Sequence, residues 1–164
     1  MPADDPDSRA LAQRLGAQLA ARGLVLTTAE SCTGGLVAGA VTDIAGSSGW
    51  FDRGYVTYSN AAKIAMLGVP EATLSAHGAV SEATAAAMAA GALAAAGAGI
   101  AVAVTGIAGP GGAVPGKPVG TVCFGWARRG RPVATATRLF PGDRAAVRQA
   151  TVIAALAGVL DRLD

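Results

Sequence analysis

Two apolar, strand-like runs in this chain each end in a cluster of hydroxyl side chains and glycines. Residues 24–26, Leu-Val-Leu, lead into residues 30–35, Glu-Ser-Cys-Thr-Gly-Gly. Residues 100–104, Ile-Ala-Val-Ala-Val, lead into residues 105–112, Thr-Gly-Ile-Ala-Gly-Pro-Gly-Gly. Strands that end in this way present hydroxyl oxygens and backbone N–H groups at the carboxyl edge of a sheet, where open α/β sheets bind ligands. The two segments therefore predict one composite pocket for an anionic or amide-bearing small molecule.

Helical and strand-like patterns alternate along the chain, which favours an α/β fold. Helices are expected over residues 7–22, 33–42, 61–67, 82–96 and 143–163, with a brief one from Pro70, and strands over 24–28, 51–59, 100–105, 119–127 and 132–140. The last two strands are separated by residues 128–131, Arg-Arg-Gly-Arg, which is typical of a hairpin-like turn. Because the 164 residues contain no repeat or linker, we expect a single domain, 1–164, built as a sandwich around a mixed sheet.

The composition disfavours several classes of protein. Aromatic residues make up 4% of the chain and the net charge is +2, so stacking platforms for nucleic acid are not expected. The two cysteines, Cys32 and Cys123, and the single histidine, His77, form neither a disulfide framework nor a metal-ligand spacing. We therefore expect no metal, no cofactor and a reducing, cytoplasmic location. Because the N-terminal residues are acidic and polar, we expect no secretory signal.

An uncharged stretch, residues 83–104, is long enough to cross a bilayer. However, it consists mostly of Ala and Gly, and residues 97–99, Gly-Ala-Gly, interrupt it. Short apolar runs between glycines are typical of core elements, so we expect a buried helix followed by a buried strand and no contact with a membrane.

Two other patterns suggest chemistry but have a simpler structural interpretation. Residues 111–117 match most of a phosphate-binding P-loop, yet Pro118 stands where a hydroxyl should hold Mg²⁺, and the following segment is strand-like. Cys32 near a predicted helix N-terminus suggests a nucleophilic thiol. Since His77 is far off in sequence, we favour a packing role for Cys32.

Lysine is rare in this arginine-rich chain, where Lys63 and Lys117 stand beside 11 arginines. A desolvated Lys can give up its proton near neutrality, whereas Arg cannot, which makes Lys63 a candidate base. The alternative, a solvated charge on a helix surface, is equally consistent with this fact. Ser48 lies in a loop of small residues and could form a Ser–Lys nucleophilic pair with Lys63, or could simply be a turn residue.

Arg144 and Arg148 are four residues apart and so share a face in the first turns of the last predicted helix. Two guanidinium groups beside the free N–H groups of a helix start can form an anion site. Pairing of one arginine with Asp143, or exposure to solvent, remains an equal alternative.

Together these segments resemble the C-terminal domain of the competence/damage-inducible CinA proteins, a family that includes stand-alone nicotinamide-nucleotide amidases. The matching segments span about residues 8–163 in the family's order: 29–35 (AESCTGG), 46–48 (GSS), 58–60 (YSN) with Lys63, 78–82 (GAVSE), 105–112 (TGIAGPGG), 117–121 (KPVGT) and 142–144 (GDR) with Arg148. Ala61 and residues 113–116 depart from the family pattern, which affects substrate affinity more than chemistry.

The resemblance implies a three-layer α/β/α fold around a mixed sheet, a homodimer, and hydrolysis of the carboxamide of nicotinamide mononucleotide without a cofactor. The nucleotide-processing domain that precedes this domain in larger CinA proteins, and its activity, would be absent. An alternative is a non-catalytic module that binds a pyridine nucleotide or supports a competence- or damage-associated partner.

The resemblance also implies roles for individual residues. Ser48 would be the nucleophile, Lys63 its base, and Tyr58 the group that orients Lys63 or relays the proton. The remaining assignments are Thr105 with the N–H groups around Gly106, Gly109 and Gly111 for the oxyanion, and Ser31, Thr33, Arg148 and Arg144 for ribose and phosphate.

Overall fold

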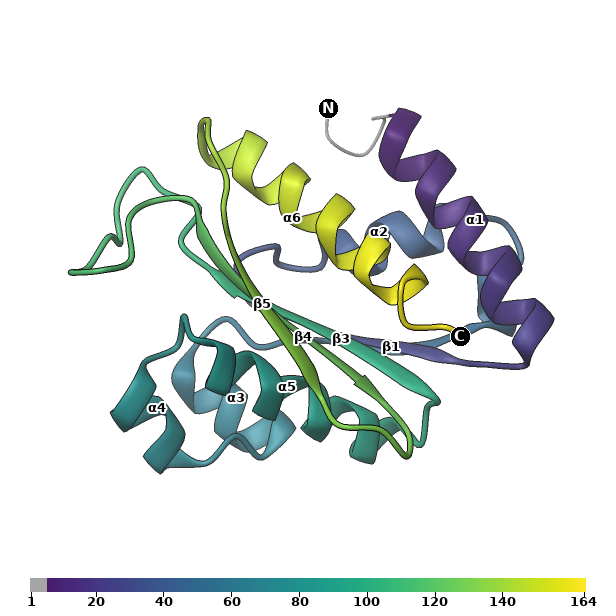
Figure 1. Cartoon of the computed structure of the whole chain (residues 1–164), viewed down its shortest axis with the longest axis horizontal. Coiled ribbons are helices and arrows are strands. Elements are labelled where there is room, and N and C mark those ends of the chain that lie inside the picture. Colours follow the sequence, from purple (N-terminus) through teal and green to yellow (C-terminus); the bar gives the residue numbers. More distant parts are fainter. Residues whose placement is uncertain (1–5) are drawn as a thin grey trace.

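The computed structural model describes residues 6–164 and places helices on both faces of a five-stranded sheet. The strands are β1 (Leu26–Glu30), β2 (Phe51–Val56), β3 (Ile100–Gly106), β4 (Thr121–Arg128) and β5 (Ala134–Leu139). The helices are α1 (Pro6–Arg22), α2 (Leu36–Thr42), α3 (Asn60–Leu67), α4 (Glu71–His77), α5 (Glu82–Ala96) and α6 (Arg144–Leu160), and a 3₁₀ turn, η2, covers Ser47–Gly49. In Figure 1, α1, α2 and α6 lie on one side of the sheet and α3, α4 and α5 on the other, which confirms the three-layer prediction.

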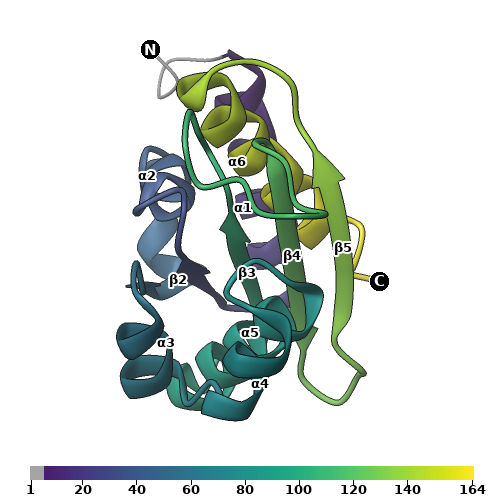
Figure 2. The same ribbon diagram turned by 90° about the vertical axis from the view of Figure 1, so that its left-hand side faces the viewer.

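The strand order is β2-β1-β3-β4-β5, with β1 parallel to both β2 and β3, and β4 antiparallel to both β3 and β5. The chain passes from β1 to β2 through α2 on one face, and returns from β2 to β3 through α5 on the opposite face (Figure 2). The connections therefore diverge between β1 and β3. In open α/β sheets this is the point where a crevice forms outside the carboxyl ends of the strands.

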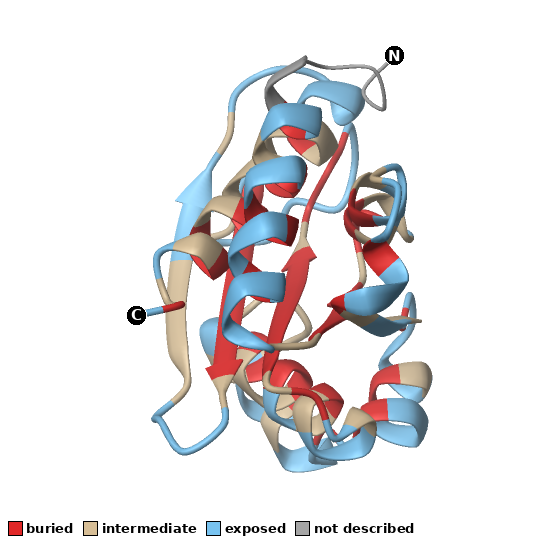
Figure 3. Ribbon diagram, turned by 90° about the vertical axis from the view of Figure 1, so that its right-hand side faces the viewer, coloured by how far each residue is buried: buried red, intermediate tan, exposed pale blue. Residues whose placement is uncertain are grey.

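Side-chain size differs between the two faces of the central strand β3. Ile100, Val102 and Val104 belong to the apolar cluster beneath α1 and α6, whereas Ala101 and Ala103 belong to the cluster beneath α5. Figure 3 shows this burial along the central strands. Because successive strand residues point to opposite faces, the alternation of large and small residues sets two different helix-to-sheet distances. The alanine-rich α5 lies so close that a Cβ on Gly125 of β4 would stand 2.5 Å from the Ala85 carbonyl oxygen.

A second close approach joins α3 to α5. A Cβ on Gly91 of α5 would lie 1.9 Å from the carbonyl oxygen of Leu67 in α3. That separation is far below van der Waals contact, so only glycine fits between the two helices at this point. Leu67 lies one helical turn from Lys63, and the position of α3 therefore depends on this contact.

Two element boundaries beside the pocket differ from the prediction. The first strand is shifted by two residues, because it begins at Leu26 instead of Leu24 and ends at Glu30 instead of Thr28. The following helix begins at Leu36 instead of Thr33, because Gly34 (φ 56°) and Gly35 (φ 109°) adopt the left-handed region and interrupt the helical path. The uncharged stretch 83–104 forms α5 and β3, and residues 6–164 include no helix with the length and apolar character needed to cross a membrane.

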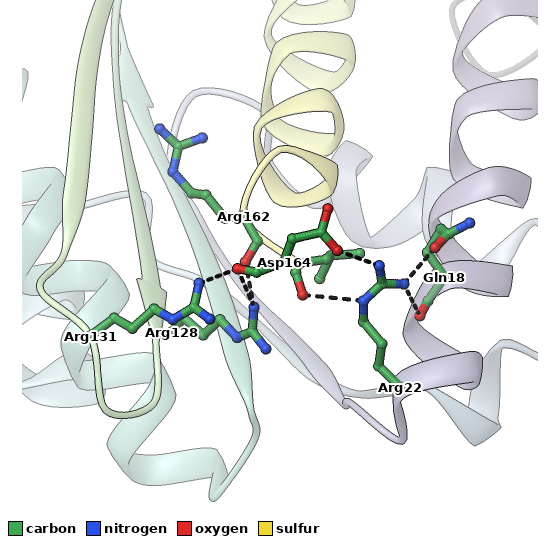
Figure 4. Close-up of polar contacts among 7 residues, drawn as sticks. Gln18, Arg22, Arg128, Arg131, Arg162 and Asp164 are labelled. Carbon is green, nitrogen blue, oxygen red and sulfur yellow. Dashed lines mark hydrogen bonds and ion pairs between the residues drawn. The ribbon is translucent and has the colours of Figure 1, made fainter.

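The arginines of the β4–β5 turn bind other parts of the same chain (Figure 4). Arg128 donates to the Arg162 carbonyl at 2.8 Å, and Arg131 to the Asp164 carbonyl at 2.5 Å. From α1, Arg22 forms an ion pair with the Asp164 carboxylate at 2.6 Å. These contacts fasten the last residues after α6 to β4, to the β4–β5 turn and to α1.

Candidate active site

The predicted composite pocket is present where β1 and β3 end side by side. Glu30 pairs in register with Val104, and the Ser31 N–H continues the ladder by donating to the Val104 carbonyl at 3.0 Å. A cavity of about 300 Å³ lies above this edge. It is lined by the Ser31–Cys32 turn, the segment from Thr105 to Gly112, and side chains that include Tyr58, Lys63 and Arg144.

Lys63 enters this cavity from α3. Ser59 caps the helix by accepting a hydrogen bond from the Ala62 N–H at 3.0 Å, so Lys63 lies in the first turn, directed at the end of β1. Only 1% of Lys63 is exposed. Its Nζ atom donates to the Thr57 carbonyl at 2.8 Å and lies 3.0 Å from Ser31 Oγ.

The buried amine of Lys63 lacks a counter-ion. Among residues 6–164, no carboxylate lies within ion-pair distance of Nζ, and both of its hydrogen-bond partners are neutral oxygens. Burial without a compensating charge disfavours the ammonium form, and it lowers the pKa of Lys63 from its ordinary value of 10.5. A lysine with a lowered pKa beside a hydroxyl is suited to act as a general base.

The predicted pair of Ser48 and Lys63 is not assembled. Ser48 is exposed in the η2 turn before β2, whereas Thr57, which contacts Lys63, follows the other end of that strand. Six residues of extended chain separate these ends, or roughly 20 Å at the rise of a β-strand. The serine that meets Lys63 is Ser31, which the sequence analysis assigned to substrate binding.

Tyr58 also differs from its predicted role. Its side chain is 62% exposed, and its hydroxyl accepts a hydrogen bond from Arg144 Nη2 at 3.0 Å instead of contacting Lys63. Arg144 Nη1 donates to the Gly109 carbonyl at 2.9 Å. Arg144 therefore links α6, the glycine-rich segment and the segment after β2 across the mouth of the cavity.

Two predicted threonine hydroxyls bind the protein itself. Thr105 Oγ1 donates to the Ala79 carbonyl at 2.8 Å, and Thr33 Oγ1 donates to Glu30 Oε1 at 2.5 Å. Thr33 is fully buried, so its side chain is withdrawn from the ribose or phosphate contact that we predicted. The backbone near Thr105 remains at the cavity, where Gly106, Gly109 and Gly111 form part of the wall as predicted.

Arg148 lies beside a second cavity of about 680 Å³ that adjoins the first and shares Ala108 and Arg144 with it. Arg148 Nε donates to the Cys32 carbonyl at 3.1 Å, and its Nη2 to the Thr33 carbonyl at 3.2 Å. Neither arginine pairs with Asp143, which caps α6 by accepting from the Ala146 N–H at 2.9 Å. The predicted cationic face at the start of α6 is therefore present and borders the cavity.

The alternative readings of Cys32 and of residues 111–117 are resolved. Cys32 is buried, and burial raises the pKa of its thiol to about 11, which leaves it protonated at neutral pH. Residues 111–117 lie in the segment that crosses from β3 to β4, with no helix after it, and Lys117 Nζ donates to the His77 carbonyl at 2.8 Å. Cys32 is therefore not an activated thiol, and residues 111–117 do not form a phosphate-binding P-loop.

Glu30 was not among the predicted site residues, although it is 1% exposed and lies next to Ser31. Its position just ahead of a helix start was the available signal, because carboxylates stabilise helix N-termini. Within residues 6–164, His, Cys, Asp and Glu side chains form no group of three or more that could hold a metal ion.

An α/β sandwich with a polar pocket at the divergence point of its sheet is typical of small-molecule-binding proteins, and similarity to known proteins gives the family. The family model for the CinA C-terminal domain matches residues 8–163, and the chain belongs to this family. It is 56% identical over 151 residues to the Escherichia coli (strain K12) nicotinamide-nucleotide amidohydrolase PncC, covering 92% of both chains.

A longer relative and a solved crystal structure are also similar to this chain. A putative competence-damage inducible protein of Symbiobacterium thermophilum is 56% identical over 161 residues, which are 93% of this chain but 38% of that protein. The chain thus spans well under half of that longer relative. The crystal structure of the competence/damage inducible protein CihA from Agrobacterium tumefaciens superposes with a TM-score of 0.91 at 50% identity, covering 94% of both chains.

Proposed function

We propose that this protein hydrolyses the carboxamide of nicotinamide mononucleotide, giving nicotinic acid mononucleotide and ammonia, with Ser31 as nucleophile and Lys63 as base. The observation that carries the mechanism is the 3.0 Å contact between Lys63 Nζ and Ser31 Oγ inside the cavity. The substrate follows from relatives named nicotinamide-nucleotide amidohydrolase, which align over 92% of this chain.

In the first half of the reaction, neutral Lys63 accepts the Ser31 hydroxyl proton while Oγ attacks the carboxamide carbon. A neutral amine has one lone pair and two N–H bonds, so it can accept from Ser31 while still donating to the Thr57 carbonyl. The tetrahedral intermediate then collapses. The C–N bond breaks, Lys63 returns the proton to the leaving nitrogen, and ammonia departs from an ester of Ser31.

In the second half, Lys63 takes a proton from water, whose oxygen attacks the ester carbon. The C–Oγ bond breaks, Ser31 recovers its proton from Lys63, and the carboxylate product leaves. The backbone N–H of Cys32 directly follows the nucleophile in the chain and donates to no other residue among those described, and in this mechanism it would donate to the developing oxyanion. One such donor typically contributes ~10²–10³ in rate.

In this proposal, the two adjoining cavities hold the two parts of the substrate. The 300 Å³ cavity with Ser31 and Lys63 would hold the pyridine ring, and the 680 Å³ cavity beside Arg144 and Arg148 would hold the ribose phosphate. Guanidinium groups and the N–H groups of a helix start both favour a phosphate there.

An assay of ammonia release from nicotinamide mononucleotide tests this function. Wild-type protein should release one ammonia per nicotinic acid mononucleotide formed. A non-catalytic binding module would instead be stabilised thermally by the nucleotide without releasing ammonia. Stabilisation without ammonia release would therefore rule out the proposed hydrolysis.

We also propose that the protein forms a homodimer. Val56 on the edge strand β2, with Ile64 and Met66 on the neighbouring α3, are large apolar side chains that lie exposed on this side of the molecule. Light scattering coupled to size-exclusion chromatography should give twice the chain mass, and a monomer mass would contradict the proposal.

A further inference from the structure

The buried carboxylate of Glu30 is fully occupied by the turn that carries Ser31 and by the start of α2. Its two oxygens accept four hydrogen bonds: Thr33 Oγ1 (2.5 Å), Gly35 N–H (3.2 Å) and Val37 N–H (2.8 Å) donate to Oε1, and Ala38 N–H (3.0 Å) donates to Oε2. Three of these donors are backbone groups at the start of α2. A buried carboxylate is tolerated only when it is satisfied in this way.

These hydrogen bonds replace a missing helix cap. The residue at the N-cap position of α2 is Gly35, which has no side chain to accept from the first free N–H groups. Glu30, at the end of β1, supplies the acceptor from outside the helix, and its charge is favourably placed at the helix start. The start of α2 and the end of β1 are thereby fastened together, with Ser31 between them.

The same turn is held from two other sides. Arg148 donates to the carbonyls of Cys32 and Thr33, and Val104 of β3 accepts from the Ser31 N–H. Ser31 Oγ needs this support because its contact with Lys63 Nζ is 3.0 Å, and a shift of 1 Å would break the hydrogen bond.

The direction of the Glu30 carboxylate also matters for Lys63. A carboxylate within about 4–6 Å that faced the amine would favour the ammonium form, which cannot act as a base. The Glu30 carboxylate instead faces α2, and its four hydrogen bonds there hold it away from Lys63.

We propose that Glu30 is a positioning residue that sets the reach of Ser31 toward Lys63 through the turn between β1 and α2. This inference rests on the proposed function, because the effect of misplacing Ser31 is measured as a loss of turnover. Glu30 does not line the cavity, and its hydrogen bonds reach neither Ser31 Oγ nor Lys63 Nζ.

Glu30→Gln is the variant that tests it. Glutamine keeps the shape and one acceptor oxygen, but its amide NH₂ faces the Ala38 N–H, so the turn loses at least one of its hydrogen bonds. We expect kcat to fall by about 10–100-fold, KM to change by less than about threefold, and the pH dependence of kcat/KM to keep its acidic limb, since the base is unaltered.

Val159→Ala is the matched control. Val159 is fully buried near the far end of α6, so its truncation lowers the melting temperature without touching the turn. It should retain wild-type kcat at a comparable loss in melting temperature. Should Glu30→Gln fail to fold, Thr33→Val, which removes a single donor to Glu30, takes its place, with an expected loss in kcat of about 3–10-fold.

Unchanged kcat in Glu30→Gln would show a purely structural role and overturn the inference. So would an equal loss of kcat in Val159→Ala, or an acidic limb displaced by about one pH unit, which would show that Glu30 acts on Lys63 through its charge. If wild-type protein releases no ammonia, the proposed function has failed, and hydrogen exchange then decides. Faster exchange confined to residues 32–38 in Glu30→Gln supports the positioning role, and unchanged exchange there contradicts it.

Discussion

The two ends of the sheet each carry a serine in a turn of small residues, yet only one of these serines contacts a buried lysine. At the carboxyl end of β1, Ser31 lies half-buried with its oxygen 3.0 Å from the buried amine of Lys63. At the opposite end, Ser48 is exposed ahead of β2. Ser48 is nearer than Ser31 to Lys63 in sequence, but the full length of β2 separates Ser48 from the segment that contacts Lys63. The strand direction, more than separation along the chain, determines which serine hydroxyl lies beside Lys63.

Exchanging each serine for alanine is the sharpest test of this difference. Ser31→Ala should reduce kcat for ammonia release by roughly 10⁴-fold or more, because the nucleophile is lost. Ser48→Ala should stay within about twofold of wild type, since surface substitutions leave the site intact. Circular dichroism and melting temperature establish that both variants fold. The reverse ranking of the two rates would restore Ser48 as the nucleophile.

Lys63→Met should reduce kcat by about 10²–10⁴-fold, the usual contribution of a general base. Methionine keeps the length and the apolar stem of lysine but cannot accept a proton. In the wild type, kcat/KM should rise with pH, tenfold per unit below the lowered pKa of Lys63, and level off below pH 10.5, where an ordinary lysine would still be charged. The residual activity of Lys63→Met should not show this rise of kcat/KM with pH. An identical limb in the variant would mean that another group is the base.

The same lowered pKa predicts the sign of a stability change. Between the pKa of Lys63 in the folded protein and its ordinary value of 10.5, the unfolded chain binds more protons than the folded one. The free energy of unfolding should therefore rise with pH across this window, and the contribution should be absent in Lys63→Met. Urea unfolding of both proteins at several pH values measures it.

Nicotinamide riboside, which lacks the phosphate, should be a poorer substrate by about 10²-fold in kcat/KM. The phosphate is expected beside Arg144 and Arg148, and a charge-assisted pair of this kind contributes about 1.5–3 kcal/mol. Arg144→Ala should narrow the gap between the two substrates, with little change for the riboside. Equal rates for nucleotide and riboside would remove the argument for an anion site at the start of α6.

Treatment with EDTA should change the rate by less than about 10%, the smallest effect expected. The proposed mechanism needs only Ser31, Lys63 and backbone donors. Recovery of a lost rate on adding back Zn²⁺ or Mg²⁺ would show that a metal takes part.

Much of the architecture could be predicted because it depends on local periodicity. The amphipathic first helix, the alanine-rich α5 and the apolar β3 all lie where their patterns placed them. The two polar strand ends also met in one pocket as predicted, since parallel strands share a carboxyl edge. Element boundaries were less predictable, as the left-handed Gly34 and Gly35 delayed the start of α2.

The pairing of side chains within the site could not be predicted in the same way. The sequence indicated a Ser–Lys pair, and Lys63 was identified by its rarity, but which serine it meets depends on how α3 packs against the end of β1. The direction of the Glu30 carboxylate, which also withdraws Thr33, is likewise a result of the folded turn. Tertiary packing determines such contacts, and residue type and spacing alone do not specify that packing.

The close approach of α3 and α5 gives Gly91 an importance out of proportion to its chemistry. It touches no substrate and carries no functional group, yet any added methyl would collide with the Leu67 carbonyl and push away the helix that delivers the amine. For protein engineering, this position belongs with the active site even though it lies one helix behind it. A library that diversified only the pocket walls would overlook the spacer that sets how far the lysine extends.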